Sequence, residues 1–140
     1  MPFNTLKTTL FGALIMSAAP LSACAQTQSS SSPDSPPAIA APADAEAVVV
    51  TLDLQAKDAE AFKSHLLKVI PVTRQASGAQ YSWSTQDPQD PTRFTLIQGW
   101  DSVEQQQGYL AWRGERGDLE EFADFLVSPP DVQVRVVFDE

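Results

Sequence analysis

The chain of 140 residues contains a single cysteine, a single histidine and a single asparagine. Because there is no second cysteine, an intramolecular disulfide is excluded, and the folded part must be stabilised by its own hydrophobic core. The lone His65 has no cysteine and no carboxylate cluster at ligand spacing beside it. We therefore expect no metal site.

Positive charge is scarce as well. Lys and Arg together number 9 against 18 Asp and Glu, and the net charge is −9. A nucleic-acid-binding surface needs clustered basic side chains, so nucleic acid is excluded as a partner. The same shortage gives the chain little electrostatic attraction to anionic lipid, so any membrane contact must have another source.

A run of apolar and small residues extends from 8 to 23 and follows Lys7. This run is too short for a stable membrane-spanning helix and is typical of a signal peptide. It ends in Leu21-Ser22-Ala23-Cys24, which resembles the lipobox of bacterial lipoproteins, where the cysteine is acylated and becomes the mature N-terminus. An ordinary secretory signal followed by a stray cysteine is the alternative.

The lipobox resemblance implies that residues 1–23 are removed as a lipoprotein signal peptide. It also implies that acyl chains on Cys24 hold the protein on a membrane of the bacterial cell envelope, facing the periplasm. The next residue, Ala25, resembles that of lipoproteins passed on to the outer membrane.

Residues 25–45 contain five Ser, four Pro and six Ala and no aromatic residue. Such a segment cannot bury enough apolar surface to offset the entropy lost on ordering. We therefore expect residues 24–45 to be a disordered tether that reaches roughly 25 Å as a flexible coil. The folded part is then 46–140, one domain of ordinary small size.

Hydrophobic periodicity predicts the secondary structure of this domain. Apolar residues alternate from Val48 to Leu54, which indicates a strand. Asp58 is a suitable N-cap for an amphipathic helix, which Pro71 should kink or split and Gly78 should end. The further predicted elements are strands at 80–85 and 93–100, a helix from 103 to about 112, a short helix from 118 and a last strand at 132–138.

Two capping boxes support the later helices, Ser102 with Gln105 and Asp118 with Glu121. The predicted order β-α-β-β-α-α-β is a ferredoxin-like α+β pattern, with helices on one face of an antiparallel sheet. The other face of the sheet still carries apolar residues, and so short a domain has nothing left to cover it. We therefore expect a homodimer joined through the sheets.

Residues 87–94 read D-P-Q-D-P-T-R-F, and the predicted strand that follows ends in Trp100. This stretch resembles the antibiotic biosynthesis monooxygenase (ABM) superfamily, whose members carry a turn of the form D-P-x-x-P-x-R-F and then a strand that ends in Trp. A further stretch, from Tyr109 to Leu119, resembles one branch of the superfamily in which a Gly-Asp pair opens an extra helix. The resemblance covers essentially all of 46–140. The matching residues of the turn and strand are Asp87, Pro88, Pro91, Arg93, Phe94 and Trp100.

The resemblance implies a dimeric α+β barrel with a pocket between the sheet and the helices of each subunit. It also implies oxygenation of quinols or polycyclic phenols without a cofactor, or haem degradation as in a sister group. In that superfamily, catalysis is usually credited to an Asn near the first strand, the Trp that ends the third strand, and a His, Tyr or Arg facing the pocket.

The chain departs from this pattern. Its one asparagine, Asn4, lies in the predicted signal peptide, and Gln98 stands where members often have Glu. The second predicted helix has no histidine, so haem degradation is not expected. Trp100 is the one matched catalytic position, with core packing as its alternative role.

Four further residues are candidates for substrate binding: Gln98, Trp83, Tyr109 and Arg113. Tyr109 and Trp112 lie off the apolar stripe of their helix, so we expect them to be exposed at a partner surface or a pocket mouth. Arg113 is expected to meet an anionic oxygen or to form a surface salt bridge with Glu115 or Asp118.

Two residues are expected to have structural rather than catalytic roles. Trp83 shares a strand face with Tyr81, and packing in the dimer interface is the alternative to a pocket role there. His65 lies at the border of an apolar helix face and is expected to be a partly exposed surface residue.

Two functions remain open. The first is an envelope-tethered monooxygenase that acts on a quinol or aromatic small molecule with dioxygen and no bound cofactor. The second is a non-catalytic dimeric module that binds a hydrophobic ligand or an envelope partner. The family resemblance and Trp100 favour the first, whereas the missing asparagine and the lack of an evident general base favour the second.

Overall fold

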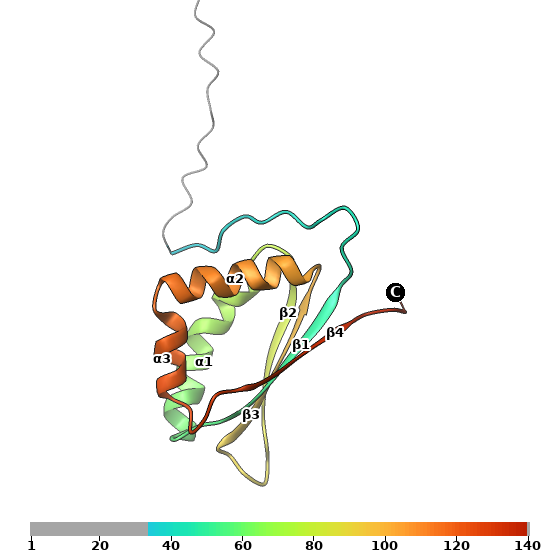
Figure 1. The fold of residues 1–140 in the computed structure, drawn as a ribbon. Helices are drawn as coiled ribbons and strands as arrows, with labels where there is room; N and C mark the ends of the chain where they lie inside the picture. Colours follow the sequence, from blue (N-terminus) through green and yellow to red (C-terminus); the bar gives the residue numbers. More distant parts are fainter. Residues whose placement is uncertain (1–33, 140) are drawn as a thin grey trace, which may run out of the picture.

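The structure is a computed structural model, and it describes residues 34–139. Within this range a four-stranded antiparallel sheet of order β2-β3-β1-β4 carries the helices on one face and leaves the other face open (Figure 1). This architecture confirms the predicted ferredoxin-like α+β fold. The elements are β1 (Val48–Gln55), α1 (Ala59–Arg74), β2 (Ala79–Gln86), β3 (Arg93–Trp100), α2 (Val103–Glu115), α3 (Asp118–Asp124) and β4 (Asp131–Val136).

The predicted signal peptide and the predicted acylation site, Cys24, lie outside the described residues. Among residues 34–139, no helix is long and apolar enough to cross a membrane.

The central strand β1 shows why alternation predicted the strands so well. Its helix-facing residues Val48 and Val50 are almost fully buried, whereas Asp53 points to the open face and is exposed. β1 pairs with β3 on one side and β4 on the other, with Val48 opposite Trp100 in β3. The side-chain period of two thus places one apolar row of β1 under the helices.

Helix α1 begins as predicted, with the Asp58 carboxylate accepting a hydrogen bond of 2.9 Å from the Ala61 N–H. It then runs to Arg74 without a break, so of the two expected effects of Pro71, a kink or a split, the split does not occur. Pro71 is exposed and leaves the carbonyl of Leu67 without its helical donor. Because the Leu67 side chain is also exposed, water can reach this part of the helix.

The core consists of two apolar clusters under the helices, and Leu52 of β1 packs against both. The first lies under α1 and α3 and is built from Leu54, Ala56, Phe62, Leu66, Phe94, Leu96 and Leu126. The second lies under α2 and is built from Val48, Val50, Ala76, Trp100 and Tyr109.

Of the two predicted N-caps of the later helices, one is present and one is not. Ser102 accepts a 3.2 Å hydrogen bond from the Gln105 N–H and caps α2 as expected. The N-cap of α3 is Gly117, with φ +78° and no side-chain cap, and Asp118 is the first helical residue. The predicted Asp118 capping box is therefore wrong, because that carboxylate is engaged by arginine side chains instead.

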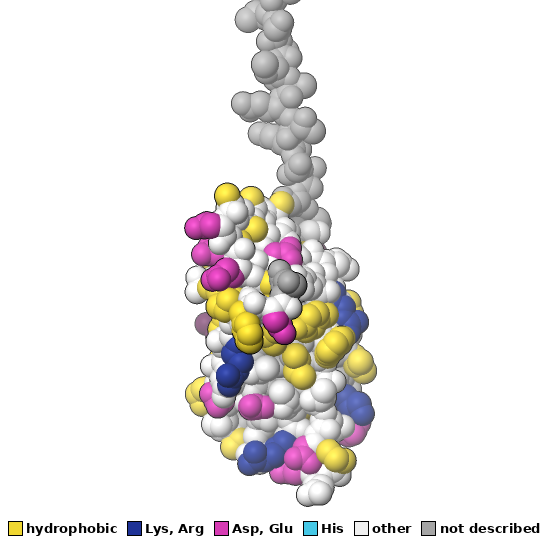
Figure 2. All heavy atoms as spheres, turned by 90° about the vertical axis from the view of Figure 1, so that its right-hand side faces the viewer, with side chains coloured by type: hydrophobic (Ala, Val, Ile, Leu, Met, Phe, Trp, Pro, Cys, Tyr) yellow, Lys and Arg dark blue, Asp and Glu magenta, His cyan; other side chains and the backbone are white. Residues whose placement is uncertain are grey.

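The open face of the sheet is apolar in its middle. Figure 2 looks onto this face and shows hydrophobic side chains gathered there, with charged groups to either side. The register places Val49, Tyr81, Trp83 and Ile97 on this face, and Trp83 is 56% exposed.

Candidate functional site

Polar side chains lie between the two apolar clusters, on the helix side of the sheet. We call His65, Tyr109, Arg113 and Asp118 the polar seam. Tyr109 belongs to the second cluster, and His65 stacks on Phe125, which packs against the first. Arg113 joins the two sides, because its guanidinium lies 5.8 Å from the Tyr109 ring and its charge reaches His65.

His65 is buried, with 8% of its surface exposed, so the expectation of a partly exposed surface residue is wrong. The cause is α3, whose Phe125 ring stacks on the imidazole at 4.6 Å between centroids. Nδ1 lies 3.8 Å from a carboxylate oxygen of Glu121, beyond hydrogen-bond distance. Nε2 is buried and has no hydrogen-bond partner among the described residues.

Burial lowers the pKa of His65 below its ordinary value of 6.5. Removing the ring from water disfavours the imidazolium more than the nearby Glu121 carboxylate favours it, and the positive charge of Arg113 acts in the same direction as burial. His65 is therefore neutral at pH 7, and one ring nitrogen is a free proton acceptor.

Tyr109 is buried, with 5% of its surface exposed, so the expectation of an exposed aromatic is wrong. Its hydroxyl lies 2.8 Å from the Thr73 hydroxyl, and that Thr73 hydroxyl donates a hydrogen bond of 3.3 Å to the Val69 carbonyl. Because Thr73 donates its one hydrogen to Val69, Tyr109 donates to Thr73. Burial raises the pKa of Tyr109, so its phenol stays protonated at neutral pH.

Arg113 is buried and its Nε lies 3.1 Å from Oδ2 of Asp118. The predicted salt bridge to Asp118 is present, but it lies within the fold and not on the surface. The same carboxylate oxygen lies 3.2 Å from Nε of Arg116. Of the two alternatives for Arg113, the structure therefore shows the salt bridge.

Trp100 has no exposed surface and therefore lines no solvent-accessible pocket. It packs within the second cluster, and its ring centroid lies 5.4 Å from that of Tyr109. The indole N–H donates a 3.1 Å hydrogen bond to the side-chain oxygen of Gln98. Of its two alternative roles, core packing is the one that this geometry matches, and Gln98 supports the indole.

Trp83 lies on the other side of the sheet from the polar seam. It is stacked on Tyr81 at 4.8 Å between ring centroids, on the open face. The sheet separates this pair from Tyr109 and Arg113, so the candidate binding residues do not converge on one pocket.

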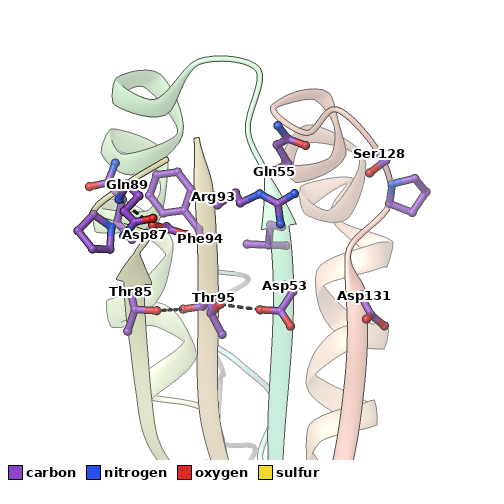
Figure 3. A pocket seen from close by; sticks show the side chains of 14 residues that line it. Asp53, Gln55, Thr85, Asp87, Gln89, Arg93, Phe94, Thr95, Ser128 and Asp131 are labelled. Carbon is purple, nitrogen blue, oxygen red and sulfur yellow. Dashed lines mark hydrogen bonds between the residues drawn. The ribbon is translucent and has the colours of Figure 1, made fainter. Parts of the chain in front are cut away.

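Sequence reasoning did not identify a wide hollow of about 1020 Å³ at one end of the open face (Figure 3). There Thr95 donates a hydrogen bond of 2.5 Å to Asp53, and Thr85 donates one of 2.9 Å to the Thr95 carbonyl (Figure 3). These groups bond to one another, and within the described part of the chain no unpartnered buried group lines the hollow. No group of three or more His, Cys, Asp or Glu within residues 34–139 could hold a metal ion. We therefore place the candidate site at the polar seam.

No protein-family profile matches this chain, and no curated protein does. Solved structures do match. A proposed antibiotic biosynthesis monooxygenase from Deinococcus radiodurans superposes with a TM-score of 0.60 and 19% identity, over 66% of this chain and 94% of that one. Another from Nitrosomonas europaea superposes with a TM-score of 0.56 and 20% identity, over 68% of this chain and 93% of that one. A conserved protein from Methanosarcina mazei superposes with a TM-score of 0.59 and 14% identity, over 64% of this chain and 91% of that one. The chain therefore has the fold of ABM domain proteins.

Proposed function

We propose that this chain is a monooxygenase which oxidises a flat aromatic or quinol-type molecule with dioxygen and without a bound cofactor. The observation that carries the proposal is the buried, neutral His65, whose Nε2 has no partner among the described residues. A neutral imidazole held out of water is the general base that the sequence did not reveal. The shared fold with proposed ABM enzymes supports the same function.

The reaction needs little besides a base and a dry site. His65 removes a proton from an activated ring methylene, as in an anthrone or in the keto tautomer of a hydroquinone, and the resulting carbanion passes an electron to dioxygen. Recombination of the pair gives a peroxide, which loses water and leaves a carbonyl. One oxygen atom enters the product, the other leaves as water with both substrate hydrogens, and the substrate supplies all the electrons. The positive Arg113 beside His65 favours the anion that forms.

An uncovered apolar strip lies on the helix side of the sheet, along β4. The helix-facing residues of β4 are about half exposed, with Val132 at 47% and Val134 at 48%. Val132 is the register partner of Leu52, the residue that packs against both clusters. This strip is the exposed apolar surface on which a flat apolar substrate would first bind.

His65→Gln tests the proposed base, because glutamine keeps a polar side chain of similar length that cannot accept the proton. We expect oxygen uptake with an anthrone or a naphthohydroquinone to fall by about 10²-fold or more, with the fold and ligand binding retained. Glu60→Gln, on the exposed side of the same helix, is the matched control. Unchanged uptake in His65→Gln would refute the role of His65.

The buried Trp100 favours the second candidate, a non-catalytic dimeric module that binds a hydrophobic ligand. The one position matched to family catalysis has no exposed surface, and the asparagine that the family uses is missing. This candidate predicts that the wild-type chain binds the aromatic probe without any oxygen uptake above the protein-free rate. The oxygen electrode therefore separates the two functions.

We further propose that the chain is a homodimer joined through the open faces of its sheets. The apolar middle of that face and the half-exposed Trp83 support this arrangement. Light scattering should give twice the chain mass at micromolar concentration, and Trp83→Asp should give a folded monomer. A wild-type monomer under these conditions would rule the dimer out.

We also propose that Cys24 carries the membrane anchor at the periplasmic side of the envelope. The support is the Leu21-Ser22-Ala23-Cys24 sequence. Cys24→Ala should be lost from the membrane fraction or accumulate with its signal uncleaved. Normal processing and membrane association of this variant would contradict the proposal.

A further inference from the structure

The N-terminal segment, whose composition predicted a free tether, is bonded to the folded domain. The Ile39 N–H donates a 3.1 Å hydrogen bond to Oγ of Ser77, and that hydroxyl donates one of 3.3 Å to the Pro37 carbonyl. The side-chain amide of Gln105 donates a 2.8 Å hydrogen bond to the Ile39 carbonyl. One short stretch of backbone is thus held by side chains from the α1–β2 connection and from α2.

The end of the Ile39 side chain lies directly against Gly108 of α2. A Cβ built on Gly108 would lie 2.2 Å from Cδ1 of Ile39. By contrast, a Cβ on Gly114 of the same helix would meet Cδ1 of Leu119 at 3.6 Å, an ordinary van der Waals contact. Glycine weakens a helix interior by about 0.5–1 kcal/mol relative to alanine, so Gly108 has a cost that the Ile39 contact explains.

The outer end of the segment contacts the other end of α2. Oδ1 of Asp34 lies 3.2 Å from Nη1 of Arg116, at the α2–α3 corner. Asp34 therefore lies near the end of α2 and Ile39 near its start, so the segment runs antiparallel to the helix. Figure 1 shows this path, with the segment running along α2 before it enters β1.

We infer that residues 34–39, the strap, are a part of the folded domain that fixes the chain's exit at the α2–α3 corner. Asp34 lies on the helix side of the sheet, away from the open face proposed to meet a second copy (Figure 1). The strap contacts α2 at Gln105 and Gly108, next to the face from which Tyr109 and Arg113 enter the core. It thereby positions the helix that carries half of the polar seam.

One consequence rests on the proposed acylation of Cys24. With the strap docked, only residues 25–33 separate the anchor from the domain. Nine extended residues span at most about 30 Å, so the α2–α3 corner must stay within that distance of the membrane surface. An undocked tether ending at residue 45 would impose no such orientation.

Hydrogen exchange on the full chain in detergent micelles tests the strap directly. We expect the Ile39 amide to exchange about tenfold or more slowly than in an unstructured peptide, because it is bonded to Ser77. Ser77→Ala should restore fast exchange there, whereas amides of β1 and β3 stay protected. Gly114→Ala, which changes α2 away from Ile39, is the control and should leave Ile39 protected.

Two results would overturn the inference. One is an Ile39 amide that exchanges at the free-peptide rate in the wild-type chain. The other is protection that survives Ser77→Ala. Neither result depends on a substrate, on oxygen uptake or on acylation, so the strap can fail while the proposed function stands, and the reverse also holds.

Discussion

Replacing Trp100 with phenylalanine measures whether this side chain fills the core or serves a ligand. Trp100 has no exposed surface, so its smaller replacement loses apolar contact worth about 1 kcal/mol and leaves part of the space unfilled. The hydrogen bond from the indole N–H to Gln98 is lost as well, at about 1 kcal/mol. Because Gln98 is only half-buried, water can satisfy its oxygen in the variant.

The expected loss in the free energy of unfolding is therefore about 2 kcal/mol, which lowers the melting temperature by about 8–16 °C for a domain of this size. Thermal unfolding followed by far-ultraviolet circular dichroism gives this number. The loss should not depend on protein concentration, since Trp100 lies on the helix side of the sheet. Trp83→Phe on the open face is the comparison, and its effect should vary with concentration if the sheets form the dimer.

A Trp100→Phe variant that melts like the wild type would refute this reasoning. If the same variant also lost binding of an aromatic probe, Trp100 would line a ligand pocket and the filled core would be wrong. Early melting with unchanged probe binding would leave His65 as the residue on which the monooxygenase proposal depends.

Three further predictions concern the polar seam. Because the folded state has the lower His65 pKa, the unfolded chain protonates first, so stability should fall as pH drops below about 6.5 and level off below the folded pKa; His65→Gln should flatten this melting profile. Tyr109→Phe removes the hydrogen bond to Thr73 and should cost about 1 kcal/mol in urea unfolding; no cost would mean that the bond contributes nothing net. Asp118→Asn leaves the buried Arg113 without its countercharge and should cost about 2–3 kcal/mol, and a cost below that of Tyr109→Phe would contradict the buried pair.

The fold followed from the sequence because its local signals agree with one another. Alternation from Val48 to Leu54 and the Asp58 cap each appear in the structure where they were predicted. The turn and the strand ending at Trp100 resemble those of the ABM superfamily, and the solved neighbours share the fold. Patterns with a period of two or 3.6 residues report on the buried face, and four strands with covering helices allow few topologies.

The site could not be predicted in the same way. On α2 the apolar residues Val103 and Leu110 indicated the buried face, yet the structure buries Tyr109 and Arg113 and leaves Leu110 at 37% exposure. A buried helix face can be lined by polar residues that pair with one another, as Arg113 pairs with Asp118. Such a face shows no apolar residues at helical spacing, so the sequence pattern does not reveal it. His65 is buried by α3, an element distant in the sequence, and no local pattern reports such packing.

The strap was missed for a related reason. Ile39 is the one large apolar residue in a segment rich in Ser, Pro and Ala. The average composition of the segment therefore predicts disorder and does not reveal the contact that this single residue makes. Gly108 could have given a signal, because a glycine inside a helix calls for a close neighbour. The sequence alone does not say which segment that neighbour belongs to.

Within the polar seam, the unpartnered His65 nitrogen lowers stability, and this loss can be tested against function. A buried nitrogen without a partner costs about 1–3 kcal/mol, and apolar replacements at such positions are often neutral or stabilising. His65→Leu should therefore keep the melting temperature or raise it, because leucine can pack against Phe122 and Phe125. If His65 is the base, the same variant loses oxygen uptake, so stability and activity move in opposite directions. A marked fall in melting temperature would instead show that the stacked imidazole is part of the core.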